Sequence, residues 1–284
     1  MQDAPKEPAT STNTGSKLAA PWRRLAYTAR AIASANTTVY MPLARRRYGH
    51  IEDRLVGRDT ELVIEGFQRS GNTFATVAFN LAQTRPVKLA HHLHAPAQIR
   101  MAVKLGVPCL VLIRDPIDTA VSQMIYESGV DARQALWSWI WFYRHVEASC
   151  DAVLIADFRD VSRDFGSVIR EVNERLRTNF AEFEHSEENV QRVFALIDER
   201  TRSRYGTLRE DRVPRPSRER AEQKRLVRQR VESKGLAHLR RHAYELYRAL
   251  SRGPFRLTRS GVGTWVRPCS PNAGGPNTNS PDLS

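Results

Sequence analysis

The chain has 284 residues, a formal net charge of +13 and 41% hydrophobic residues. This length fits one large domain or two small ones, and the apolar content is enough for a buried core, which excludes wholesale disorder. The longest apolar-rich stretch, residues 135–146, is shorter than the about 20 residues that a membrane span needs. It also contains Arg144 and His145, so we predict no spanning helix.

Both ends of the chain differ in composition from the middle. Residues 1–20 and 261–284 are rich in Pro, Ser, Thr and Asn, so we expect two disordered tails around a single domain at residues 21–260. The first 20 residues lack the apolar run of a secretory signal, and the three cysteines are scattered and odd in number. We therefore expect a cytoplasmic protein with reduced thiols, and leave contact with a membrane surface open.

The positive charge is concentrated late in the chain. The net charge is +5 over residues 1–60, −4 over residues 61–200 and +12 over residues 201–260. Arginine supplies 38 of the 44 basic residues, an excess that genomic base composition could also cause. The segment 201–260 is therefore read as a basic, helical C-terminal part of the domain.

Strand and helix patterns alternate between residues 60 and 180, the predicted core. In chain order we predict strands at 61–66, 87–90, 108–113 and 152–156, and helices at 73–82, 97–105, 131–150 and 161–177. A further helix begins after Asp115, which caps it, with Pro116 at the first helical position. Strands separated by helices predict an α/β architecture of three layers, with a central parallel sheet flanked by helices.

The turn after the first predicted strand has the spacing of a phosphate-binding loop, Gly66-x-x-x-x-Gly71-x-Thr73. Such a loop directs backbone N–H groups and a helix N-terminus at an anion. Nucleoside triphosphatases carry a lysine where this chain has Asn72, which disfavours triphosphate hydrolysis but leaves room for one phosphate. The alternative is a glycine-rich turn with no ligand.

A second candidate anion site follows the strand at 108–113. Arg114 lies at the end of that strand, where α/β sheets bind ligands, and Ser122 lies two turns into the next helix. The two side chains could converge on one anion, or they could be a structural arginine and a solvent-facing serine. Asp115 could hold Mg²⁺, but its role as a helix cap explains it better.

These motifs resemble the two donor-binding signatures of the sulfotransferases, of the bacterial type, which use 3′-phosphoadenosine 5′-phosphosulfate (PAPS). The first is Ser-Gly-Asn-Thr-Phe at 70–74, and the second is Arg-Asp-Pro-Ile-Asp-Thr-Ala-Val-Ser at 114–122. A His-x-Pro element at 94–96 and Phe-Arg-Asp-Val at 158–161 stand where the family has His-x-Pro and Tyr-Glu-Asp-Leu. The resemblance covers residues 60–180, with Asn72, Phe74 and Arg159 departing from the family's Thr, Trp and Glu.

The resemblance implies a P-loop-like sulfotransferase fold and sulfuryl transfer from PAPS to a hydroxyl or amine of a small-molecule, carbohydrate or lipid acceptor. It implies no metal and His94 as general base, with His92 in reserve. It also implies Ser70, Gly71, Asn72 and Thr73 on the 5′-phosphate, Arg69 stabilising the leaving phosphate, Phe74 on the adenine, and Arg114 and Ser122 on the 3′-phosphate.

Other features are open to more than one interpretation. The spacing of His91, His92 and His94 matches no known metal-ligand pattern, and the aromatic residues at 137–143 are expected in the core rather than in an acceptor pocket. Part of the basic segment, around residues 212–225, is expected to cover the 3′-phosphate. A P-loop nucleotide or small-molecule kinase is the second hypothesis, and a protein that binds nucleic acid or an anionic surface is the third. The sequence leaves the acceptor and the oligomeric state open.

Overall fold

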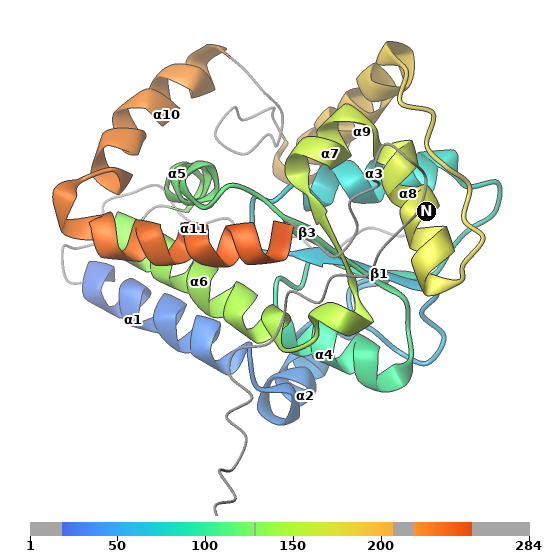
Figure 1. Ribbon diagram of the computed structural model, residues 1–284, viewed down its shortest axis with the longest axis horizontal. Coiled ribbons are helices and arrows are strands. Elements are labelled where there is room, and N and C mark those ends of the chain that lie inside the picture. Colours follow the sequence, from blue (N-terminus) through green and yellow to red (C-terminus); the bar gives the residue numbers. More distant parts are fainter. Residues whose placement is uncertain (1–18, 128, 207–217, 252–284) are drawn as a thin grey trace, which may run out of the picture.

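Four parallel strands form the centre of the protein (Figure 1). The computed structural model describes residues 19–127, 129–206 and 218–251. The strands are β1 (Leu62–Gly66), β2 (Leu89–His91), β3 (Cys109–Ile113) and β4 (Leu154–Asp157). Their order in the sheet is β2-β1-β3-β4, and each pairs in parallel with its neighbour. The predicted central parallel sheet is therefore confirmed.

Four helices cover one face of the sheet, and the largest buried cluster lies between them and the strands. They are α2 (Thr37–Tyr48), α4 (Pro96–Leu105), α6 (Ala132–Glu147) and α11 (Ala237–Ser251). Alternate strand residues such as Val63, Val111 and Ile113 point into this layer. Helix α1 (Ala19–Ala33) lies outside it, against α6 (Figure 1).

The opposite face carries a second helical layer. It consists of α3 (Asn72–Ala82), α7 (Phe158–Arg163), α8 (Phe165–Leu176) and α9 (Glu187–Tyr205). Leu62, Ile64 and Leu110 point into this layer, because successive strand residues face opposite sides. A smaller cluster joins α5 (Pro116–Tyr126) to α6, α10 (Arg218–Val231) and the 3-10 turn η2 (Lys234–Leu236). The three-layer α/β prediction is thus confirmed.

Two of the predicted helices are wrong in extent. The helix predicted at 131–150 ends at Glu147, and the 3-10 turn η1 (Cys150–Ala152) leads into β4, which starts two residues later than predicted. The helix predicted at 161–177 is two helices, because Asp164 leaves the helical region and caps α8 by accepting from the N–H of Ser167. Competition of an aspartate side chain for backbone N–H groups explains the break.

The predicted tails fall almost entirely outside the described residues. Helix α1 begins at Ala19, so the tail predicted at 1–20 overlaps it by two residues. Of the basic segment 201–260, residues 207–217 and 252–260 also lie outside, while α10 and α11 are helical. Among the helices described, none is long and apolar enough to cross a bilayer.

Candidate active site

The loop between β1 and α3 turns tightly because two glycines permit close contacts. A Cβ on Gly66 would lie 2.4 Å from the backbone oxygen of Leu112 on the neighbouring strand. Gly71 has a φ of 95°, and a Cβ there would lie 2.6 Å from the ring of Phe158. Arg69 also adopts a left-handed φ, of 70°. The loop can follow this path only with glycine at the two close approaches.

Two polar side chains of the loop turn inward. The Ser70 hydroxyl lies 3.3 Å from the hydroxyl of Tyr143, and the Asn72 amide donates to the backbone oxygen of Phe67 at 3.0 Å. Both side chains are buried, and Tyr143 in turn donates to the backbone oxygen of Leu112. The backbone N–H of Ser70 also donates to the backbone oxygen of Phe67, at 3.2 Å. Ser70 and Asn72 therefore hold the loop together, and the group that Asn72 can offer a ligand is its backbone N–H.

The N-terminus of α3 is open to an anion. Its N-cap residue is Gly71, so no side chain accepts a hydrogen bond from the N–H groups of the first turn. Those N–H groups carry the positive end of the helix dipole. The predicted phosphate-binding loop therefore has the local chemistry of an anion site.

The second predicted motif meets this loop through Arg69. The Arg69 Nε donates to the Ser122 hydroxyl at 3.0 Å, and the Arg114 Nη1 donates to the backbone oxygen of Arg69 at 3.1 Å. Arg114 also lies over the ring of Phe158, at 4.4 Å from its centroid. The sequence paired Arg114 with Ser122, whereas in the structure each contacts Arg69. Arg69 thus joins both residues of the second motif at the carboxyl edge of the sheet, Ser122 through its side chain and Arg114 through its backbone oxygen.

Asp115, the residue after Arg114, serves as a helix cap. Its Oδ1 accepts from the N–H groups of Ile117 and Asp118, at 2.9 and 3.0 Å. Its Oδ2 accepts from the hydroxyl of Tyr244 on α11 at 3.1 Å. The prediction of a cap after β3 is confirmed, and both carboxylate oxygens already have donors.

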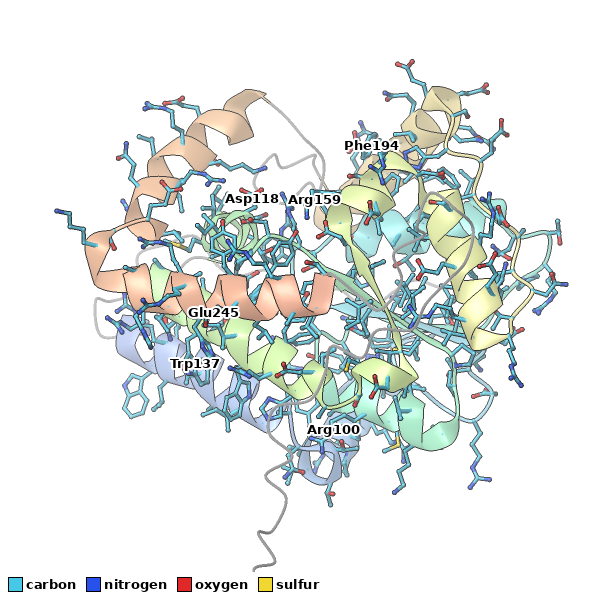
Figure 2. All side chains as sticks on the ribbon, viewed as in Figure 1. Arg100, Asp118, Trp137, Arg159, Phe194 and Glu245 are labelled. Atoms are coloured by element: carbon cyan, nitrogen blue, oxygen red, sulfur yellow. The ribbon has the colours of Figure 1, made fainter. Side chains whose placement is uncertain are left out.

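Phe74 lies among other aromatic rings. Its centroid is 5.9 Å from that of Phe194 and 6.4 Å from those of Phe165 and Phe183, which come from α8, α9 and the segment between them. Figure 2 labels Phe194 on α9, beside α3. The ring of Phe74 is half-buried in this cluster, which fixes its orientation.

His94 lies beside the first glycine of the loop. Its Nδ1 is 2.9 Å from the backbone oxygen of Gly66. Because a carbonyl oxygen only accepts, Nδ1 carries the hydrogen and Nε2 keeps its lone pair. Burial lowers the pKa of His94 to about 3, so the ring is neutral at pH 7. The lone pair of Nε2 is therefore unprotonated at pH 7, and the side chain of His94 is 17% exposed.

His92 also borders the loop. Its Nε2 lies 3.1 Å from the hydroxyl of Thr73, and its Nδ1 lies 2.8 Å from Nδ1 of His91. Burial lowers the pKa of His92 well below its ordinary value. Both ring nitrogens of His92 thus have neighbours, whereas Nε2 of His94 has no hydrogen bond with the residues that the structure describes.

A residue that the sequence analysis missed holds the histidine segment in place. Glu65 is fully buried in β1, and its two carboxylate oxygens accept from the N–H groups of Leu93, at 2.6 Å, and of His94, at 3.0 Å. The Gln98 amide also donates to it, at 3.1 Å. Burial raises the pKa of Glu65 to about 7. A carboxylate inside the apolar run Glu-Leu-Val-Ile-Glu-Gly was the signal in the sequence.

Other predicted features have the following positions. Within the described ranges, no group of three His, Cys, Asp or Glu side chains is arranged to hold a metal ion. Trp139 and Tyr143 are buried in the core, whereas Trp137 and Trp141 stack on each other and are half-buried.

A cavity of about 470 Å³ lies between α1, α2, α4 and α6, and none of the loop residues lines it.

The basic C-terminal part reaches α5, the helix that carries Ser122. Arg228 of α10 forms an ion pair with Asp118 of α5, and Figure 2 labels Asp118 on that helix. Of the residues around 212–225 that were expected to cover the 3′-phosphate, 212–217 lie outside the described residues, and 218–225 belong to α10.

Comparison with known proteins gives one kind of match. No protein-family model matches the chain, and no curated protein sequence does. Among solved structures, the chain is similar to mouse sulfotransferase SULT7A1 complexed with PAP. The identity is 15%, the match covers 72% of this chain and 89% of that chain, and the TM-score is 0.43.

Proposed function

We propose that this protein transfers a sulfuryl group from PAPS to a hydroxyl or amine of an acceptor. The observation that carries the proposal is the hydrogen bond from Arg69 to Ser122, since it joins the two motifs that resemble the sulfotransferase donor signatures. With Arg114 beside them and the N-terminus of α3 open, the edge of the sheet offers separate positive centres to a donor with two phosphate groups.

In this proposal the loop binds the donor's 5′-phosphate, and the two arginines contact the donor's phosphate groups. The backbone N–H groups of Gly71, Asn72 and Thr73 would hold the 5′-phosphate, and Ser70 would keep the loop in shape through its bonds to Phe67 and Tyr143. Arg69 would stabilise the charge that develops on the phosphate. Arg114 and Ser122 would hold the 3′-phosphate, and the edge of Phe74 would contact the adenine. Arginine suits this role because its planar fork binds phosphate through two hydrogen bonds.

The transfer step needs one base. An oxygen or nitrogen of the acceptor attacks the sulfur and forms the new bond to it. The bond between sulfur and the bridging oxygen of the 5′-phosphate breaks, and its electron pair leaves with 3′,5′-bisphosphoadenosine. The acceptor's proton passes to Nε2 of His94, whose lone pair is available because Nδ1 donates to Gly66. Positioning and charge stabilisation supply the catalysis, as in phosphoryl transfer.

A P-loop kinase is the second candidate, and two observations disfavour it. Asn72 replaces the lysine that would reach the β- and γ-phosphates, and its side chain is bonded to Phe67 inside the loop. Both oxygens of Asp115, the residue placed to hold Mg²⁺, already accept hydrogen bonds. The bacterial type, the cytoplasmic location and the class of acceptor stay predictions.

Calorimetric titration in the presence of EDTA tests the proposal. We expect 3′,5′-bisphosphoadenosine to bind without magnesium, and Arg114→Ala to weaken binding at least about tenfold, because a charge-assisted bidentate contact is lost. Arg159→Ala is the matched control, because Arg159 is exposed and already paired with Asp157. Binding of Mg-ATP alone would support the kinase instead.

A second variant tests the base. We expect His94→Ala to lower the rate of transfer about a hundredfold or more while the affinity for 3′,5′-bisphosphoadenosine stays unchanged. Acceptors can be found by incubating labelled PAPS with fractionated cell extracts and identifying sulfated products by mass spectrometry. Unchanged activity in His94→Ala would move the role of base to His92.

A further inference from the structure

Helix α1 presents an apolar stripe to solvent. Trp22, Leu25 and Ile32 are 72%, 59% and 49% exposed, respectively. At 100° per residue these three side chains fall on one side of the helix, with the exposed Ala26 and Ala29 between them. A continuous row of large apolar side chains in water is costly and marks a contact surface.

The other side of α1 packs on the domain. The hydroxyl of Tyr27 lies 2.9 Å from that of Ser138 on α6. The Gln134 amide on α6 donates to the hydroxyl of Thr28 and to the backbone oxygen of Arg24, at 3.1 and 3.0 Å. Trp22 and Leu25 therefore point away from the protein, and Ile32, at the end of the stripe, also borders the cavity between α1, α2, α4 and α6.

Helix α2 also carries exposed apolar side chains. Val39 and Leu43, one turn apart, are 51% and 58% exposed, while Tyr40 and Met41 on the other side are buried. In Figure 1 the two helices follow each other, in blue, along one edge of the molecule. We call the exposed side chains of α1 and α2 the N-terminal face.

The charge of this face has one sign. Residues 19–51 contain six arginines and no Asp or Glu. All six are exposed: Arg23, Arg24, Arg30, Arg45, Arg46 and Arg47. Asp131, the N-cap residue of α6, lies 3.4 Å from Arg24, and its carboxylate offsets part of this positive charge. Apolar residues flanked by arginines on surface helices are the pattern of helices that lie in the interface of an anionic membrane.

Other partners match this face less well. A second copy of the chain would bring the same six arginines against these, so like charges would meet. Nucleic acid would neutralise the arginines but leave Trp22, Leu25 and Ile32 in water. A bilayer with anionic headgroups satisfies both the charged and the apolar side chains.

We infer that the N-terminal face docks the protein on an anionic lipid bilayer. Helices α1 and α2 lie in the plane of the surface, with Trp22, Leu25 and Ile32 at the boundary of headgroups and acyl chains. The arginines contact lipid phosphates and anionic headgroups. This surface differs from the late basic segment, to which the sequence analysis assigned most of the charge.

Flotation of the full chain with vesicles tests the inference. We expect the protein to float with vesicles of phosphatidylcholine and phosphatidylserine, and far less with phosphatidylcholine alone. Leu25→Glu should lower the partition coefficient at least about tenfold, because a charge replaces an apolar side chain that is buried in the bilayer when the protein is bound. Each substitution among Arg45, Arg46 and Arg47 by Gln should lower it about fivefold.

Leu226→Glu is the matched control. The exposed fraction of Leu226 in α10 is 54%, similar to the 59% of Leu25. Helix α10 is also basic, and among its described side chains no other large apolar one is exposed. We expect this variant to bind like the wild type. Equal loss in both leucine variants, or no binding of the wild type to anionic vesicles, overturns the inference.

Two further measurements test whether a folding defect or a change in oligomeric state causes the lower partition coefficient. Because Leu25 is exposed, the thermal unfolding of Leu25→Glu should match that of the wild type, which excludes a folding defect. Light scattering without vesicles should give the same mass for both proteins. A wild-type dimer that Leu25→Glu converts to a monomer, with no vesicle binding, would assign the face to a second copy instead and overturn the inference.

Discussion

At the scale of single residues, Glu65 is the clearest case of a buried group that organises the site. It accepts hydrogen bonds from the N–H groups of Leu93 and His94 and from the amide of Gln98. In Glu65→Gln an NH₂ group must face one of these donors. We expect the free energy of unfolding to fall by about 1–3 kcal/mol, the cost of a buried donor left without an acceptor.

Denaturant unfolding at pH 8 measures this effect, with Glu61→Gln as its control. Glu61 lies just before the same strand but is paired with Arg85 at the surface, so its loss should cost less than about 1 kcal/mol. Similar losses in the two variants would mean that the buried carboxylate does not hold the histidine segment.

His94 gives the protein a pH-dependent stability with a defined sign. Its pKa is about 3 in the folded state and about 6.5 when unfolded, so between these values only the unfolded chain binds the proton. The free energy of unfolding should therefore fall with decreasing pH, by about 1.4 kcal/mol per pH unit for this one group. His94→Asn keeps a donor for Gly66 and removes the titration.

Unfolding curves at pH 6, 5 and 4 check this expectation. The slope of stability against pH should be shallower in His94→Asn than in the wild type by about 1.4 kcal/mol per unit. Parallel slopes would mean that His94 accepts protons in the folded protein.

Residue patterns in the sequence predicted local features of the site, but not the contacts between side chains that are far apart in the chain. The spacing of Gly66, Gly71 and Thr73 predicted the loop, and the cap at Asp115 is confirmed. The inward turn of Ser70 could not be predicted, because it depends on Tyr143, 73 positions along the chain. Arg69 and Ser122 are also far apart in the chain, by 53 positions.

At the scale of elements, the start of α3 depends on the absence of a side chain at Gly71. Alanine there meets both an unfavourable φ of 95° and the ring of Phe158, 2.6 Å from its Cβ. Gly106, which ends α4 at a φ of 70°, has nothing within 4 Å. We expect Gly106→Ala to cost about 1 kcal/mol of stability and Gly71→Ala about 2–4 kcal/mol, the excess coming from the clash.

Thermal and denaturant unfolding of the two variants measure the difference. Binding of 3′,5′-bisphosphoadenosine should be lost in Gly71→Ala and kept in Gly106→Ala, since only Gly71 lies at the N-terminus of α3. Equal costs in the two variants would mean that Phe158 moves aside without penalty.

Elements with strong local signals were predicted well, and elements with weak ones were not. The apolar runs at 61–66 and 108–113 became β1 and β3, central strands that are buried on both faces. The break at Asp164 was missed, because an aspartate inside an amphipathic pattern caps a helix only when the neighbouring turn allows it. Helix α11 has a clear apolar side, but its contact with α6 and with the ends of β3 and β4 is a property of the whole fold.

At the scale of the whole molecule, α11 joins the basic C-terminal part to the sheet. Leu246, Tyr247 and Leu250 are buried in the main core. The hydroxyl of Tyr247 donates to Asp157 at the end of β4, at 2.5 Å, and Tyr244 donates to Asp115. Helix α11 is therefore part of the core, and we expect the domain predicted at 21–260 to need this helix for folding.

Truncation tests this dependence. A chain that ends at residue 236 lacks α11 and loses three large core side chains, each worth about 2–5 kcal/mol. Their sum, about 6–15 kcal/mol, is comparable with the about 5–15 kcal/mol that stabilises a typical domain, so we expect no cooperative unfolding transition in calorimetry. A chain that ends at residue 260, the predicted boundary, should unfold at the temperature of the full protein. A cooperative transition in the shorter chain would show that residues 19–236 fold by themselves and that α11 only docks on them.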